Sequence, residues 1–232
     1  MVIEPRRMVQ EQPRVAVLCS GGLDSTVLVA LQARSATVLP VYVRSGLAWE
    51  KTEQLSLSKL LSAQPFVGKV DSLVCLETNM LNLYSSSHWA IQGRPPAFDT
   101  PDSDTYLIGR NITLLAKVGV LCAQKRIGMI ALGPLAGNPF PDATENFFNT
   151  MARALSLGLD HTVEIVAPLR QLSKAKVIQL GLELQVPFEL TMSCMSPRER
   201  NHCGQCSKCR ERHDAFEAIG IKDPAKYVAK IT

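Results

Sequence analysis

The stretch VAVLCSGGLDSTVLVALQA, residues 15–33, changes its pattern in the middle. Val15–Cys19 is an aliphatic run typical of a buried strand, and over 24–34 the apolar residues follow a helical spacing. The junction between them consists of glycines and short polar side chains. A strand that passes directly into a helix in this way is typical of a βα unit in a parallel sheet. The stretch therefore predicts an α/β fold.

The junction, residues 20–25, also predicts a phosphate site. The N-terminus of a helix presents unpaired N–H groups at its positive end. Gly21 and Gly22 let this backbone approach an anion closely, and Ser20, Ser25 and Thr26 add hydroxyl groups. The loop lacks the Gly-Lys-Ser/Thr of the ATPase P-loop and the spacing of the dinucleotide motif. An ordinary tight turn in which Asp24 caps the helix is the alternative interpretation.

The rest of the chain repeats the alternation of strands and helices. Further strands are predicted at 37–43, 72–76, 129–133 and 162–166, and helices at 49–61, 110–125, 144–157 and 172–184, the last opened by Ser173 as its N-cap. The polar, proline-broken stretch 79–105 is predicted to be a long loop or lid. This order indicates a doubly wound parallel sheet with helices on both faces. Ligands bind such sheets at the carboxyl ends of the strands.

Composition limits the class of protein. With 232 residues, the chain suits one main domain, predicted at 14–189, and a small C-terminal segment, 190–232. The polar residues 1–13 are predicted to be a disordered tail. A net charge of +4 identifies no partner. The sequence has no long apolar run and no signal-peptide core, so we expect a cytoplasmic protein without a membrane partner.

Four of the seven cysteines cluster near the C-terminus, as Cys194-x8-Cys203-x2-Cys206-x2-Cys209. Four thiolates at short spacing suit one tetrahedral, structural Zn²⁺ per chain. An iron–sulfur cluster is an alternative that the spacing leaves open, and disulfides are disfavoured by the length of the chain and the lack of a signal sequence. His202 is a candidate substitute ligand, although a solvent-facing loop histidine is the simpler interpretation. The other three cysteines, Cys19, Cys75 and Cys122, are expected to be core residues.

The hexapeptide SGGLDS after an apolar strand resembles the PP-loop of the N-type ATP pyrophosphatases. Those enzymes use ATP to adenylate a carbonyl, carboxylate or amide oxygen and release pyrophosphate. The resemblance implies that ATP, with Mg²⁺, is a substrate. The position of Lys174 supports this independently of the resemblance. A lysine in the first turn of a helix lies unfavourably at the positive end of the helix dipole, and an anion beside it would offset this repulsion. The implied ATP-binding residues are Ser20, Gly21, Gly22, Leu23, Asp24, Ser25, Thr26 and Lys174.

Together with the cysteines, several segments resemble the 7-cyano-7-deazaguanine synthases of the PP-loop superfamily. These segments are TYLIGRN (105–111), FPDAT (140–144), LSKAKVIQLGLELQVPFELTMSC (172–194) and CGQCSKCRERHDAF (203–216). The resemblance implies an adenine nucleotide alpha hydrolase-like fold and catalytic roles for Lys174, Asp24 and Arg110. It implies substrate binding by Arg110, Asn111, Asp142 and Glu50.

The implied activity is that of an ATP-dependent C–N ligase. It would convert 7-carboxy-7-deazaguanine and ammonia to 7-cyano-7-deazaguanine through adenylated intermediates and release AMP and pyrophosphate. A homodimer is expected from the resemblance alone, and no nucleic-acid partner is expected.

The chain also departs from that family in the loops 44–49 and 144–146. A related PP-loop adenylating ligase or a tRNA-modifying enzyme with another acceptor is therefore an alternative. A second alternative is a zinc-ribbon nucleic-acid-binding protein with an inactive nucleotide fold. The basic run of Lys208, Arg210 and Arg212 is its best feature, and the intact PP-loop argues against it.

Overall fold

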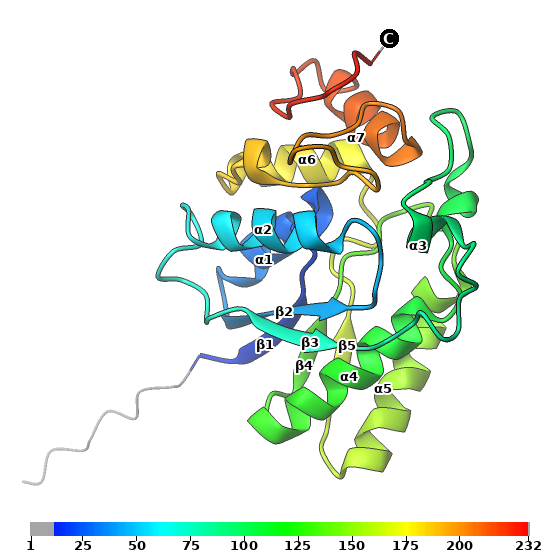
Figure 1. Ribbon diagram of the computed structural model, residues 1–232. Helices are drawn as coiled ribbons and strands as arrows, with labels where there is room; N and C mark the ends of the chain where they lie inside the picture. The colour runs from blue at the N-terminus through cyan, green and yellow to red at the C-terminus, as the bar shows by residue number, and fades with distance from the viewer. Residues whose placement is uncertain (1–11, 232) are drawn as a thin grey trace, which may run out of the picture.

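The structure of the protein, a computed structural model, describes residues 12–231, and the tail predicted at 1–13 lies almost wholly outside them. A sheet of five parallel strands forms its centre (Figure 1), in the order β3-β2-β1-β4-β5. The strands are β1 Arg14–Leu18, β2 Thr37–Arg44, β3 Val74–Glu77, β4 Met129–Ala131 and β5 Glu164–Val166. The predicted doubly wound parallel sheet is therefore confirmed.

Helices cover both faces of the sheet. The longer ones are α1 Leu23–Gln32, α2 Glu50–Leu61, α4 Arg110–Lys125, α5 Glu145–Leu159, α6 Lys174–Glu183 and α7 Ser207–Glu217. Successive strand residues point to opposite faces. Val15 and Val17 of β1 therefore pack in the core that contains α1, α2 and α6, while Ala16 packs in the core of α4 and α5. Figure 1 shows these two layers above and below the strands, with α7 beyond α6.

The strand order reverses beside β1, which decides where a ligand can bind. The chain runs from β1 outward to β2 and β3, then returns to β4 on the other side of β1. The connections diverge at this point, and a crevice opens beyond the carboxyl ends of β1 and β4. The loop 20–22 follows β1 directly and therefore lies at this crevice.

The predicted elements are present, with shifts of a few residues at their ends. The stretch 79–105, predicted to be a loop or lid, contains the short helix α3 Trp89–Gln92 and a 3-10 turn at Asp102–Thr105. Ala90 of α3 belongs to a third core that includes Trp49, Leu107 and the four clustered cysteines. Helix α7 was not predicted, because its sequence carries thiols and charges rather than an apolar stripe. Among residues 12–231, no helix is long and apolar enough to cross a bilayer.

Candidate functional site

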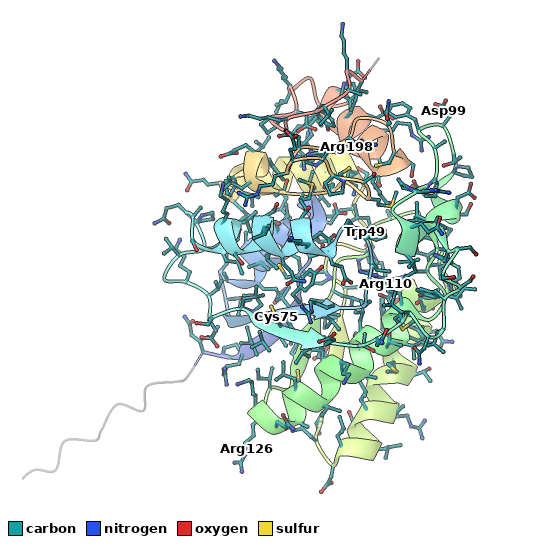
Figure 2. The ribbon with its side chains drawn as sticks, viewed as in Figure 1. Trp49, Cys75, Asp99, Arg110, Arg126 and Arg198 are labelled. Carbon is teal, nitrogen blue, oxygen red and sulfur yellow. The ribbon has the colours of Figure 1, made fainter. Side chains whose placement is uncertain are left out.

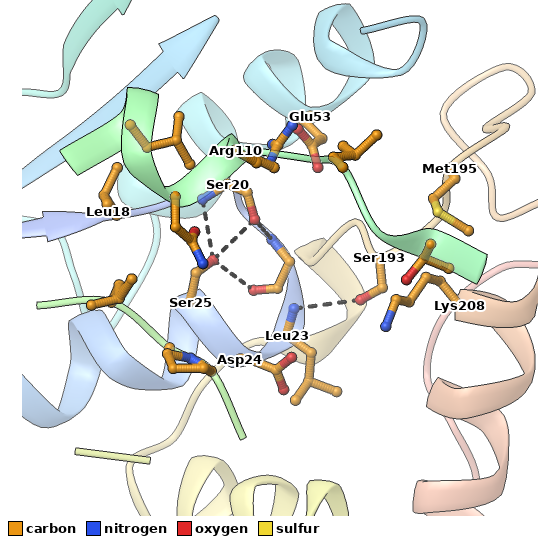
Figure 3. Close-up of a pocket in the computed structure, with 18 of the residues that line it drawn as sticks. Leu18, Ser20, Leu23, Asp24, Ser25, Glu53, Arg110, Ser193, Met195 and Lys208 are labelled. Atoms are coloured by element: carbon orange, nitrogen blue, oxygen red, sulfur yellow. Dashed lines mark hydrogen bonds between the residues drawn. The ribbon is translucent and has the colours of Figure 1, made fainter. Parts of the chain in front are cut away.

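A cavity of about 390 Å³ lies beyond the carboxyl ends of β1, β2 and β4. Its walls come from the loop 20–25, α2, the segment 105–111, the loop after β4, and α6 and α7 with the segment before α7. Figure 2 shows Trp49 and Arg110 near this end of the sheet, whereas Arg126, at the other end of α4, points away from the body of the molecule. Figure 3 shows Arg110 and Glu53 on one side and Lys208 with Ser193 on another.

The loop 20–25 is held by its own hydroxyl groups. Ser25 Oγ and Thr26 Oγ1 donate to the carbonyl of Gly22 at 3.1 and 2.8 Å, and Ser20 Oγ accepts from the Gly22 N–H at 3.2 Å. The hydroxyl groups of Ser25 and Thr26, predicted as donors to an anion, thus fix the loop instead. Within the described part of the chain, the N–H groups of Asp24 and Ser25 have no acceptor. The groups left free to bind an anion in this loop are therefore backbone N–H groups at the start of α1.

The two glycines of the loop have different roles. Gly21 has φ +79° and lies against α2, where an added Cβ would be 3.1 Å from Leu57 Cβ. Gly22 has φ −71°, which any residue adopts. Gly21→Ala is therefore expected to lower the free energy of unfolding by about 1–2 kcal/mol. Gly22→Ala, the matched control, should change it much less. Urea unfolding of the two variants measures this difference, and equal losses would contradict it.

Charged side chains from three helices form a network beside this loop. Lys174 Nζ contacts Asp24 Oδ2 at 2.6 Å and Glu211 Oε1 at 2.9 Å, and Lys208 Nζ contacts Glu211 Oε2 at 2.7 Å. Burial alone would lower the pKa of Lys174, but the charges of Asp24 and Glu211 outweigh it and raise the pKa above its usual value. The two ammonium groups likewise outweigh burial and lower the pKa of Glu211 to about 2. Lys174 and Glu211 are therefore both ionised near neutral pH.

Asp24 has one carboxylate oxygen that the network does not use. Oδ1 is buried and has no hydrogen-bond partner among the described residues, while Oδ2 holds Lys174. Burial of a carboxylate oxygen without a hydrogen-bond partner costs free energy, unless a cation or a hydrogen-bond donor contacts that oxygen. Mg²⁺ prefers oxygen ligands of this kind and commonly bridges a carboxylate to substrate phosphates. The residues present therefore fit a magnesium–phosphate group at this position.

A second cluster, Glu53, Tyr42 and Arg110, lies on the opposite side of the cavity. Burial raises the pKa of Glu53 to about 7, although the Arg110 charge and the Tyr42 hydroxyl oppose this shift. Tyr42 donates to Glu53 Oε2 at 2.8 Å. The Arg110 guanidinium makes no ion pair or hydrogen bond to the described residues. Arg110 was predicted and Glu53 was not, since nothing in its local sequence distinguishes it from a surface residue of α2.

The other predicted substrate-binding residues are engaged with one another or with loops. Asp142 Oδ2 accepts from the backbone N–H of Asn111 at 3.0 Å, and Asn111 Nδ2 donates to the Asp142 carbonyl at 2.8 Å. Both residues line the cavity. Glu50 is not among the lining residues; its two oxygens accept from the N–H groups of Ser45 and Gly46. Glu50 thus supports the loop 44–49 from behind the cavity wall.

The four clustered cysteines meet as the spacing predicted. Their Sγ atoms all lie within 4.8 Å of one another, with three pairs at 3.5–4.0 Å. A tetrahedron of sulfurs around Zn²⁺ has S···S distances of about 3.8 Å, so the geometry fits such an ion. Backbone N–H groups of Ser196, Cys203 and Gln205 donate to these sulfurs at 3.2–3.3 Å, which favours the thiolate form.

The remaining cysteines are only partly as predicted. Cys19 and Cys122 are buried core residues, as expected, and burial raises the pKa of the Cys19 thiol to about 12. The prediction for Cys75 was wrong, because β3 is an edge strand and leaves this thiol exposed.

His202 is not the solvent-facing histidine that its loop suggested. Its side chain is buried, its Nε2 accepts from the Ser193 N–H at 3.1 Å, and its ring packs against Tyr227. Burial and the nearby Arg212 charge lower the pKa of His202 to about 4, which suits this acceptor role. It is absent from the set of side chains that could share a metal ion with the cysteines.

The basic run of α7 forms no free basic surface. Arg212 is fully buried and paired with Asp223, and Arg210 donates to the carbonyls of Phe98 and Thr100. Lys208 is paired with Glu211. The feature that best favoured a nucleic-acid-binding protein is therefore occupied by contacts within the chain.

Comparisons with known proteins identify relatives of this chain. A family model described as queuosine biosynthesis protein QueC matches residues 14–220. The 7-cyano-7-deazaguanine synthase of Aliarcobacter butzleri is 38% identical over 215 residues, which cover 90% of this chain and 93% of that protein. The one from Methanopyrus kandleri is 32% identical over 228 residues, covering 91% and 97%.

Among solved structures, the predicted subunit of tRNA methyltransferase from Methanocaldococcus jannaschii is similar with a TM-score of 0.51. The match covers 94% of this chain and 93% of that one. At 14% identity, this likeness concerns the fold alone.

Proposed function

The chain belongs to the family of the queuosine biosynthesis protein QueC, and on this premise we propose that it converts 7-carboxy-7-deazaguanine to 7-cyano-7-deazaguanine with ATP and ammonia. The observation that carries the ATP-dependent step is the set of unpaired N–H groups at the start of α1 in the same cavity as Lys174. A backbone cradle and a cation together suit the leaving pyrophosphate of an adenylation.

The proposed reaction has two adenylation steps. A carboxylate oxygen of the substrate attacks the α-phosphorus of ATP, and pyrophosphate leaves. Ammonia then displaces AMP from the acyl adenylate and gives the primary amide, with loss of a proton. The amide oxygen attacks a second ATP, pyrophosphate leaves again, and loss of AMP and a proton from the adenylated imidate leaves the nitrile.

The residues divide into two ends of the cavity in this proposal. The loop 20–25 and Lys174 bind the phosphates, and Asp24 Oδ1 would hold Mg²⁺, which supplies positive charge to the phosphate oxygens when bound. Arg110 would face the substrate carboxylate. Glu53, Asp142 and Asn111 would form hydrogen bonds with the deazapurine ring, whose guanine-like edge carries N–H donors.

The loops that depart from the family hardly touch this cavity, which favours the same acceptor over a new one. Of the residues 44–49, only Trp49 lines the cavity, and none of 144–146 does. Thr144 instead caps α5, accepting from the Phe147 N–H at 3.2 Å. The alternative of a different PP-loop ligase rested on these departures. A homodimer and a cytoplasmic location stay predictions.

Incubation of the zinc-loaded protein with 7-carboxy-7-deazaguanine, ammonium and Mg-ATP tests the proposal. We expect AMP and pyrophosphate in equal amounts, and mass spectrometry should detect first the amide and then the nitrile. Omitting the deazapurine should reduce pyrophosphate release to the background rate. ADP and phosphate as products would contradict the adenylation step, and neither amide nor nitrile despite pyrophosphate release would indicate another acceptor.

A further inference from the structure

Helix α7 connects the cysteine cluster to the candidate nucleotide site. Cys206 is the N-cap residue of this helix and Cys209 lies in its first turn. Lys208, Glu211 and Arg212, on the same two turns, line the cavity that contains the loop 20–25. A metal bound to the thiolates would therefore also fix these three side chains relative to the loop.

The charges of the cavity show what Lys208 contributes. Asp24 and Glu211 place two negative charges where a polyphosphate would bind, and Lys174 contacts both of them. Lys208 supplies the fourth charge and makes this group of side chains neutral. Without it, the group would carry a net negative charge and repel phosphate.

The position of Lys208 is compatible with contact to a bound anion. Its ammonium group contacts the same carboxylate as Lys174, and its side chain retains 31% of its exposure. Figure 3 shows it extending into the space that Ser193 and the Ser20–Ser25 loop also border. A lysine used only for an i,i+3 helix pair could have pointed along the outer surface of α7.

We infer that Lys208 is a second lysine for the phosphates of ATP, delivered by the helix that carries the cysteine cluster. This inference rests on the proposed function, because it takes ATP as the ligand of the loop 20–25. Arg212 does not have this role, since Asp223, Thr191 and the Phe188 carbonyl occupy its guanidinium. The chemistry recognised is a magnesium pyrophosphate or triphosphate.

Calorimetric titration with magnesium pyrophosphate and with Mg-ATP tests this role without any need for turnover. Lys208→Met is expected to weaken the binding of both ligands by about tenfold or more, with a smaller difference at high salt. Lys208→Arg should restore most of the affinity. Lys222→Met, which removes the same charge from an exposed position of the same C-terminal segment, should bind like the wild type. Zinc content measured for each variant shows whether the cluster is intact.

The variant Glu211→Gln distinguishes a Lys208 that contacts phosphate from a Lys208 that serves only as the ion-pair partner of Glu211. If Lys208 serves only to pair with Glu211, both substitutions should weaken binding alike. If Lys208 binds phosphate, Glu211→Gln should bind pyrophosphate at least as tightly as the wild type, because it removes a repelling charge and leaves both ammonium groups. Wild-type affinity in Lys208→Met would overturn the inference. A wild-type protein that binds neither ligand would instead overturn the proposed function.

Discussion

Replacing Cys206 with serine is expected to abolish the binding of zinc and to lower the melting temperature by about 10 °C or more. The four sulfurs lie within 4.8 Å of one another in a core that also contains Trp49, Leu107 and Met192. A structural metal contributes its binding free energy to folding, which for sites of this kind amounts to about 10 kcal/mol. Loss of one ligand leaves three buried thiols without the ion that holds them together.

Elemental analysis and thermal unfolding of the same preparation measure this effect. The wild type should contain about one zinc per chain, and a chelator should lower its melting temperature toward that of the variant. Cys75→Ser is the matched control, because Cys75 is exposed and outside the cluster. It should retain both zinc and stability. Stoichiometric iron with visible absorbance, or full zinc in Cys206→Ser, would contradict the prediction.

Lys174→Met is expected to reduce the rate of pyrophosphate release by about 10²–10³-fold. Lys174 contacts both Asp24 and Glu211 and lies in the cavity with the free N–H groups at the start of α1. Its raised pKa keeps it charged throughout the neutral range. In the variant, the leaving pyrophosphate would no longer be stabilised by the Lys174 charge. It would also be repelled by the Asp24 carboxylate, which would have lost its ion-pair partner.

Two controls keep this prediction separate from a loss of folding. Lys176→Met removes a lysine from an exposed position of the same helix and should leave the rate unchanged. Circular dichroism of Lys174→Met should match the wild type before its rate is interpreted, and Lys174→Arg should recover part of the activity. A folded Lys174→Met that releases pyrophosphate at the wild-type rate would show that this lysine does not act on the phosphates.

The elements of the fold, the glycine loop between its first strand and helix, and the meeting of the four cysteines could be predicted from local sequence. The period of two in the strands and 3.6 in the helices depends only on neighbouring residues, so the β–α alternation around SGGLDS predicted the parallel sheet. The short spacings among the cysteines likewise predicted that the four thiols lie close together, as they do in the structure. Such patterns can be recognised in the sequence because each arises within one or two consecutive elements.

The tertiary structure decided which charged side chains share the cavity and which are buried. Lys174 and Asp24 are 150 residues apart in the chain, yet they are in contact. Glu53, Glu211 and Lys208 have no local pattern that distinguishes them from surface residues, and His202 and Arg212 were expected to face solvent or a partner. Their environments come from elements that are distant in the chain and pack together only in the folded protein. Burial and pairing of a side chain depend on those distant neighbours, which periodicity and spacing do not encode.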